Sequence, residues 1–318
     1  MSRLKGKMIN YLRKLTYKKI NPMPSFPFLS QLTFIRLRVI FEAIDEVIFH
    51  NYKGYLYHAG LSEALRDEVC NRKNKDCQDC NRRYDCFYFS LFECTTRPDH
   101  PHVQKYPKSP HPYIISPIPD EKTAYKKGDR FGFELTIIGN MDEQLPLLYN
   151  VFWQMGKRGI GVNRGRYKPV DIQLSDVRQE EDNIPLGVEN KVKLTFETPL
   201  QLGKDKFVLE NLPPFELLMN RMALRFSLLS HFQFGSDYFE PEYRINGITL
   251  SPDSDAKYVN WGNFKKGTLK FDGLVGNIIY EGEGLQNWLP LLIPGTQLQV
   301  GSKTAFGLGK YCIESIEQ

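Results

Sequence analysis

The sequence predicts an α+β protein made of two similar units in tandem, each with the element order β-α-β-β-α-β. Three observations support this prediction. The chain has 318 residues, a length that suits two domains. Strand-like and helix-like segments follow one another in the same order in both halves of the chain. A glycine-rich stretch with cationic residues recurs near the end of each half, as an internal duplication would leave it.

The first unit begins with a strand at residues 32–44, which are rich in β-branched and aromatic side chains. A helix at residues 58–70 follows, because Leu61, Leu65 and Val69 recur at helical spacing. The remaining elements complete a ferredoxin-like unit: strands at 113–118 and 129–139, a helix at 145–156 and a closing strand at 167–177.

The second unit repeats this order. Residues 191–202 are strand-like, and residues 213–233 form a long apolar helix that starts with proline. Residues 267–282 are predicted to form a hairpin that turns at Asp272-Gly273, because Asp-Gly favours two-residue turns. The unit is completed by a short helix at 285–292 and a strand at 309–316.

These elements divide the chain into four parts. The polar segment 178–190, with one proline and one glycine, is the predicted linker. The other parts are a basic N-terminal arm at 1–30, an N-terminal ferredoxin-like domain at 31–177 with a cysteine-rich insertion at 70–94, and a C-terminal ferredoxin-like domain at 191–318 that ends in a glycine-rich loop.

Composition and charge narrow the class of protein. A hydrophobic content of 41% suits a globular protein with a substantial core. The first twenty residues contain seven Lys or Arg and no acidic residue, a pattern that meets phosphate groups or forms a solvated amphipathic helix. There is no signal-peptide pattern and no apolar run long enough to span a bilayer. We therefore expect a cytoplasmic protein without a membrane partner.

The two glycine-rich stretches read QMGKRGIGVNRGRY at residues 154–167 and QVGSKTAFGLGKY at residues 299–311. Each joins the second helix of its unit to the last strand. The second stretch fits neither a Walker loop nor a dinucleotide fingerprint, because Lys310 is followed by Tyr311 and position 312 is a cysteine. We interpret the pair as a duplication.

These stretches supply bare backbone and positive charge, the two features that contact phosphate groups of RNA. The alternative is that they are tight turns that pack against the neighbouring domain, with solvated cations. The predicted RNA-binding residues are Lys157, Arg158, Arg164 and Arg166 in the first stretch, and Gly301, Lys303, Gly307, Gly309 and Lys310 in the second.

Five of the six cysteines lie between residues 70 and 94. Cys70, Cys77, Cys80 and Cys86 include a central Cys-x-x-Cys, which suits a tetrahedral structural zinc site that would order a polar insertion. An iron–sulfur cluster has no supporting spacing, and a set of free thiols is the alternative. Cys94 has the character of a small core residue, as does Cys312.

Several motifs in this order resemble one known family. The stretch LYHAGLSEALRDEVC (56–70) is similar to its first-helix signature, and CQDCNRRYDCFYFSLFE (77–93) to the cysteine and Leu-Phe-Glu pattern of one subgroup. The two glycine-rich stretches are similar to its mid-chain and C-terminal loops. The chain thus resembles the RAMP superfamily of CRISPR-associated proteins, and within it the endoribonuclease that processes precursor CRISPR RNA, the sixth Cas family. It departs from the pattern at His58-Ala59, where Arg-Gly is usual, and at Gln299, where many members have histidine.

The resemblance implies metal-independent cleavage of precursor CRISPR RNA within its repeats. The ribose 2′-OH attacks the adjacent phosphate and leaves a 2′,3′-cyclic phosphate and a 5′-OH end. This reaction needs a general base, a general acid and positive charge at the phosphate, but no cofactor. The implied partners are CRISPR repeat RNA, the processed crRNA and a CRISPR effector complex.

In the resembling family, catalytic histidines cluster near the first helix, which makes His58 the predicted general base; Tyr57 would orient it and Lys53 would stabilise charge. A packing or capping role is the alternative for His58, and His50 is a further option. His100, His102 and His111 are predicted to lie on the surface, and His231 to have a hydrogen-bonded packing role. Two other functions stay open: a non-catalytic RAMP subunit that holds guide RNA, and a zinc-stapled tandem RNA-recognition protein unrelated to CRISPR.

Overall fold

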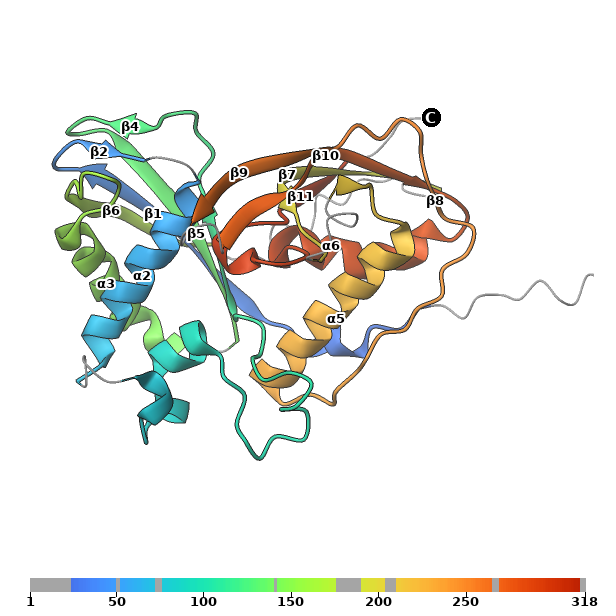
Figure 1. The fold of residues 1–318 in the computed structure, drawn as a ribbon, viewed down its shortest axis with the longest axis horizontal. Coiled ribbons are helices and arrows are strands. Elements are labelled where there is room, and N and C mark those ends of the chain that lie inside the picture. Colours follow the sequence, from blue (N-terminus) through green and yellow to red (C-terminus); the bar gives the residue numbers. More distant parts are fainter. Residues whose placement is uncertain are drawn as a thin grey trace, which may run out of the picture.

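A computed structural model of the chain shows two domains side by side, each with an antiparallel sheet covered by two helices on one face (Figure 1). The predicted α+β architecture with two ferredoxin-like units is confirmed. The basic arm to residue 23 and nearly all of the predicted linker lie outside the described residues, which are 24–49, 52–71, 76–139, 142–175, 190–203, 210–264 and 269–314.

The N-terminal sheet has the strand order β3-β5-β1-β6, with every neighbouring pair antiparallel. This is the order of a ferredoxin-like unit, and each element lies where the sequence predicts it. The first helix starts five residues earlier than predicted, so Lys53 lies on the helix. The bounds are β1 Phe34–Ala43, α2 Lys53–Val69, β3 Tyr113–Pro117, β5 Arg130–Ile138, α3 Leu145–Arg158 and β6 Tyr167–Ser175.

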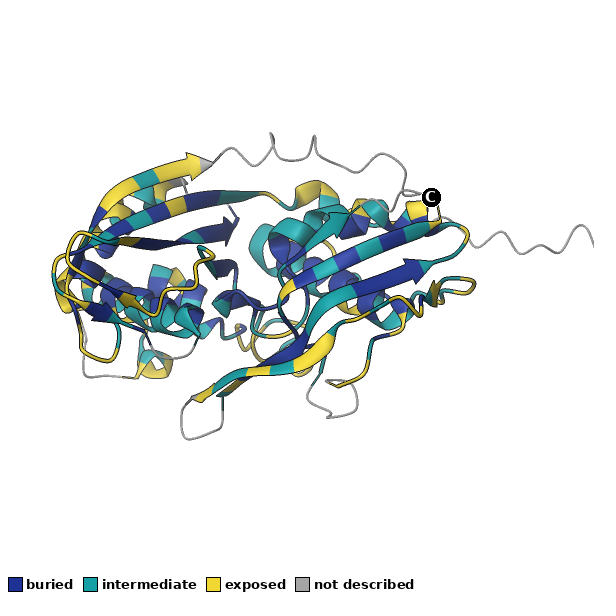
Figure 2. Cartoon of the chain, turned by 90° about the horizontal axis from the view of Figure 1, so that it is seen from above, coloured by how far each residue is buried: buried dark blue, intermediate teal, exposed yellow. Residues whose placement is uncertain are grey.

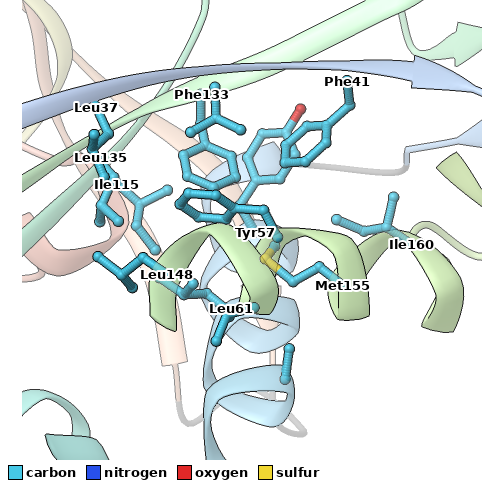
Figure 3. Close-up of a cluster of buried hydrophobic side chains, with 14 of the residues drawn as sticks. Leu37, Phe41, Tyr57, Leu61, Ile115, Phe133, Leu135, Leu148, Met155 and Ile160 are labelled. Atoms are coloured by element: carbon cyan, nitrogen blue, oxygen red, sulfur yellow. The ribbon is translucent and has the colours of Figure 1, made fainter. Parts of the chain in front are cut away.

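The core of this domain lies between the sheet and the helices α2 and α3. Alternate residues of β1, among them Leu37 and Phe41, point to this face, where they meet Leu61 of α2 with Leu148 and Met155 of α3 (Figure 3). All five are almost fully buried. Each such side chain contributes about 1.5–3 kcal/mol of transfer free energy, and this burial fixes the position of α2 on the sheet.

The C-terminal sheet has the order β11-β7-β10-β8, and β9 also pairs with β10. Helices α5 and α6 pack on one face of it around a second core. Buried positions recur along the strands of both domains (Figure 2). The bounds are β7 Lys191–Leu200, α5 Phe215–Phe234, β8 Thr249–Leu250, β9 Lys257–Phe264, β10 Leu269–Glu281, the 3-10 helix η8 Leu285–Trp288, α6 Leu289–Leu298, the 3-10 helix η9 Thr304–Phe306 and β11 Tyr311–Glu314.

The predicted hairpin turn at Asp272-Gly273 is wrong. Strand β10 runs straight through these residues and pairs with β9, which precedes it in the chain. The pair lies at a register irregularity instead of a turn: Gly273 has a φ of 148°, and its backbone passes close to the Leu200 carbonyl. Asp272 is buried, and its carboxylate accepts hydrogen bonds from Gln201 and Tyr258.

Two smaller features were not predicted. Strand β2 (Val47–Ile48) pairs with β4 (Ala124–Tyr125) in a separate small sheet. The 3-10 helix η1 (Pro27–Gln31) lies at the end of the predicted arm, yet Phe28 is buried in the core of the C-terminal domain. Within the described ranges, no helix is long and apolar enough to cross a membrane.

A group of histidines makes one of the contacts between the two domains. His231 at the end of α5 donates from Nδ1 to the Ser236 carbonyl (2.6 Å), as its predicted packing role requires. Its Nε2 lies 3.2 Å from Nε2 of His100, and the ring of His102 packs against Tyr238. The loop predicted to be surface therefore crosses to the C-terminal domain, and burial lowers the pKa of His100, as do the neighbouring histidines.

Candidate functional site

A cleft of about 700 Å³ lies between the two domains. The N-terminal domain contributes the start of α2 and the segment after β3, and the C-terminal domain contributes β7, β9 and the terminal glycine-rich loop. Three residues that the sequence singled out, Lys53, Gly307 and Lys310, line this cleft. The other lining residues are Tyr52, Ser116, Pro117, Ile118, Pro119, Asp120, Glu121, Lys122, Thr123, Glu197, Thr198 and Trp261.

Lys53 is held at the wall of the cleft by two partners. Its ammonium group forms an ion pair with Asp120 and donates to the Tyr125 hydroxyl (2.6 Å). The Tyr125 hydroxyl in turn donates to both carboxylate oxygens of Asp120 (2.6 Å each). Only 13% of the Lys53 side chain is exposed, so these contacts fix the cation in one place.

This arrangement keeps Asp120 ionised. Partial burial raises the pKa of Asp120, but hydrogen bonds from Lys53 and Tyr125 outweigh burial, and the pKa lies below its ordinary value. Burial and the hydrogen bond to Asp120 raise the pKa of Tyr125. At neutral pH Asp120 is therefore a carboxylate and Tyr125 a neutral phenol.

The C-terminal domain adds a second cation to the same cleft. Lys310 forms an ion pair with Glu197 (2.8 Å), and its backbone N–H donates to the Thr198 hydroxyl (2.8 Å). The Thr198 hydroxyl donates to the Gly307 carbonyl (2.9 Å). The end of β7 thus holds the glycine-rich loop and its lysine against the cleft.

Two glycines of the terminal loop, Gly307 and Gly309, do not offer bare backbone N–H groups, contrary to expectation. The N–H of Gly307 donates to the Thr304 carbonyl (2.8 Å) and that of Gly309 to the Pro199 carbonyl (3.1 Å). Both glycines are buried. Their role in this structure is the one given by the alternative interpretation, a tight turn at the domain boundary; Lys310 is the part of the loop that presents charge to the cleft.

The two glycine-rich loops begin and end with the same backbone geometry. The residues that correspond, however, differ from those that the sequence match paired. Gly159 and Gln299 cap their helices with similar angles (φ 73°, ψ 163° and φ 57°, ψ 164°). The next residue in each loop donates to the last glycine, Gly165 in the first loop and Gly309 in the second. Gly301 therefore matches Gly161 and not Gly156, and the second loop is longer because it contains η9.

Replacement of Gly309 with alanine is expected to destabilise the protein strongly. Gly309 has a φ of 77°, and an added Cβ would overlap the Val300 carbonyl. Gly235 is the matched control, because its φ is 69° and no heavy atom lies within 4 Å of an added Cβ. We expect Gly235→Ala to cost about 1–2 kcal/mol from the left-handed conformation alone. Urea unfolding should show a clearly larger loss for Gly309→Ala, and equal losses would contradict the packing role.

His58 lies on α2 beyond Lys53 but does not line the cleft. Its ring stacks on Phe306 of η9, with centroids 4.1 Å apart and planes at 23°. Phe92 and Tyr113 contact it from the N-terminal domain. The structure thus brings the predicted base into contact with the terminal loop, within an aromatic cluster. His50 lies outside the described residues.

Tyr57 and Lys303 lie away from the cleft. Tyr57 is 1% exposed and packs between Phe49 and Phe133 in the core (Figure 3), so its hydroxyl does not reach a surface open to RNA. Lys303 donates to the side-chain oxygen of Gln201 (2.5 Å), which belongs to the buried network around Asp272.

The cations of the first loop are not brought to the cleft either. Lys157 is exposed at the end of α3. Arg158 pairs with Glu63 and Asp67 on α2, and Arg164 lies 3.9 Å from Glu63. Arg166 makes a two-point contact with Asp45 through Nε (2.7 Å) and Nη2 (3.2 Å), and this hydrogen bonding lowers the pKa of Asp45. The two loops therefore do not flank one cleft.

The four predicted zinc ligands come together at one place. Cys70, Cys77, Cys80 and Cys86 line a cavity of about 30 Å³, and burial raises the pKa of Cys77. Four thiols suit zinc as a donor set. Among the described side chains, however, no three His, Cys, Asp or Glu residues are arranged as a metal-binding group. The zinc site stays a prediction.

Metal analysis tests that prediction. We expect one zinc per chain in the purified protein, lost in a Cys77→Ser, Cys80→Ser double variant together with thermal stability. Cys312→Ser is the control, since Cys312 lies on β11 in the other domain. Metal-free protein with unchanged stability after zinc addition would contradict the site.

Sequence reasoning missed four side chains of the cleft. Asp120 and Glu197 hold the two lysines, and Tyr52 packs on Trp261 with ring centroids 5.2 Å apart. In the sequence, Trp261 could be recognised only as an aromatic residue in a segment with strand-like alternation. No sequence pattern distinguishes Asp120 or Glu197, because each meets its lysine only in the folded chain.

Two family models match the chain, one in each half. Residues 32–195, just over half of the chain, match a family model described as an N-terminal domain (AF_1859_N). Residues 194–311 match the model of the CRISPR-associated endoribonuclease Cas6. The second match covers the C-terminal domain, and the chain is a Cas6-type CRISPR-associated endoribonuclease.

Solved structures share the fold at low sequence identity. A Cas6 product complex from Thermus thermophilus has a TM-score of 0.53 and 14% identity, over 89% of this chain and 100% of that chain. A partial Cas6-RT-Cas1–Cas2 complex has a TM-score of 0.51 and 13% identity, over 92% of this chain and 47% of that chain. No curated protein matches the sequence significantly.

Proposed function

We propose that this endoribonuclease cleaves precursor CRISPR RNA within its repeats without a metal ion and keeps the processed crRNA bound. The ribose 2′-OH attacks the adjacent phosphate, the P–O bond to the next nucleotide breaks, and the products carry a 2′,3′-cyclic phosphate and a 5′-OH. RNA is therefore the proposed partner, and a CRISPR effector complex is the proposed destination of the bound crRNA.

The interdomain cleft is the observation that carries this proposal. Its lining includes lysines from both domains, Lys53 and Lys122 from the N-terminal domain and Lys310 from the C-terminal domain. Cleavage by 2′-OH attack builds negative charge on the phosphate oxygens in the transition state. Preorganised cations at that place lower the barrier because they need little reorganisation. A bound phosphate would compete with Asp120 for Lys53 and with Glu197 for Lys310.

Proton transfer is assigned to His58 as the predicted base. His58 follows Lys53 by five residues on α2, a rise of about 7.5 Å along the helix axis. The imidazole is suited to this work at neutral pH. Its contact with Phe306 links it to the same terminal loop that carries Lys310.

The test is cleavage of a cognate CRISPR repeat RNA by the full chain in EDTA. We expect one cut, a 2′,3′-cyclic phosphate on the upstream product, and no cut when the nucleotide 5′ to the site has a 2′-deoxyribose. Loss of activity in EDTA, or cleavage of the deoxy substrate, would overturn the mechanism. Tight binding with no cleavage would favour a subunit that only holds guide RNA.

A further inference from the structure

The interdomain cleft has more room and more apolar surface than phosphate binding needs. Its volume of about 700 Å³ falls within the range of about 300–1,000 Å³ that encloses small organic ligands. Lys53 and Lys310 lie at its walls, but the lining also includes Pro117, Ile118 and Trp261. A site of this composition suits a flat apolar ring joined to a negatively charged group.

The aromatic part of the wall is fixed by the residue next to Lys53. Tyr52 packs against Trp261, with ring centroids 5.2 Å apart, and Phe271 supports Tyr52 from behind (5.5 Å). Phe271 is fully buried, whereas Trp261 is only partly buried and lines the cleft. Tyr52 thus connects the platform to the cation, since it immediately precedes Lys53 in the chain.

Hydrogen-bonding groups complete the lining. The Ser116 hydroxyl accepts from the side-chain nitrogen of Gln299 (2.9 Å), which places it at the cleft from the end of β3. Asp120 and Glu121 supply acceptors, and Thr123 supplies a hydroxyl. These groups can meet the edge of a base, while the aromatic platform meets its face.

We propose that the cleft is a nucleotide subsite, which holds one unpaired nucleotide beside the scissile phosphate with its base on Trp261. This inference rests on the proposed function. The nucleotide is unpaired because a base within a duplex has both faces stacked and its edge hydrogen-bonded. Stacking on an aromatic side chain accepts any base, so the subsite selects a position in the RNA more than a base identity.

The experiment compares RNA binding by wild type, Trp261→Ala and Trp261→Phe. The probe is repeat RNA with a 2′-deoxy nucleotide 5′ to the cut, so that binding is measured without cleavage. Trp153→Ala is the matched control, because Trp153 is 47% exposed on α3, away from the cleft. We expect Trp261→Ala to weaken binding by about 5- to 100-fold, as loss of one stacked base does. Trp261→Phe should retain most of the affinity, and Trp153→Ala all of it.

A scan of single abasic sites identifies the bound nucleotide. In wild type, one abasic position next to the cut should weaken binding as much as Trp261→Ala does. In Trp261→Ala the same abasic position should have no further effect, because the stacking partner is already gone.

The outcomes separate this inference from the proposed function. If wild type cleaves repeat RNA and Trp261→Ala binds it unchanged, the subsite is wrong and the endoribonuclease assignment stands. If wild type binds but does not cleave, the mechanism fails, and the abasic scan still decides on the subsite. If Trp261→Ala loses affinity equally at every abasic position, Trp261 acts through the fold and the subsite is overturned.

Discussion

Replacement of Lys53 with alanine is expected to lower the rate of RNA cleavage by at least about 100-fold, the usual cost of removing one preorganised group that stabilises transition-state charge. The Lys53 side chain is 13% exposed, and Asp120 and Tyr125 hold its ammonium group in one place. Affinity should fall much less than the rate, because one phosphate contact contributes little to binding at moderate salt. Single-turnover cleavage and equilibrium binding, measured on the same RNA, give the two numbers.

Two controls make this result specific. Lys168→Ala removes another lysine that is paired with a carboxylate, Glu42 (3.0 Å), but lies outside the cleft, and it should cleave at the wild-type rate. Asp120→Asn tests whether the holding group matters: it keeps the size of the side chain but removes the charge opposite Lys53. A Lys53→Ala variant that cleaves normally would remove this cation from the mechanism, and the cleft would then be only a binding site.

The fold was predictable because each ferredoxin-like element carries its own local pattern. Strand β1 has β-branched and aromatic residues throughout, and α3 places Leu148, Val151, Phe152 and Met155 on one face. The failure at Asp272-Gly273 has a physical cause. Asp-Gly favours a hairpin turn in isolation, but here the carboxylate has buried partners, Gln201 and Tyr258, that only the folded domain supplies.

The sequence predicted those residues of the cleft that stand in a recognisable local pattern. Lys53 and Lys310 could be singled out in this way. Asp120 lies 67 residues beyond Lys53, and Glu197 lies 113 residues before Lys310. The first pair forms because the segment after β3 lies beside the start of α2, and the second because β11 pairs with β7 in the C-terminal sheet. Nothing in a window around either acidic residue distinguishes it from a solvated surface carboxylate.

The glycine loops show a third limit. The sequence match paired Gly156 with Gly301 because each follows a glutamine and an apolar residue, whereas the backbone angles pair Gly161 with Gly301. The longer loop uses its extra residues to form η9, which places Phe306 against α2. The two loops therefore have different roles: the first is a turn within the N-terminal domain, and the second makes a contact between the two domains.

His58 gives the second large expected effect. Replacement by alanine is expected to lower cleavage by about 10²- to 10⁴-fold, the range for loss of a positioned acid–base group. The same change also removes a ring that stacks on Phe306, so the rate alone would not separate chemistry from packing. His58→Phe separates them, because phenylalanine keeps an aromatic ring against Phe306, Phe92 and Tyr113 but cannot accept a proton.

If His58 is the base, His58→Phe retains the thermal stability of wild type and loses cleavage as fully as His58→Ala. The wild-type rate should then rise with pH through the titration of the histidine, since the base must be neutral, and the residual rate of either variant should lack that rise. If His58→Phe cleaves like wild type, the imidazole is a packing group between α2 and η9, and the proton must be taken by another residue at the cleft.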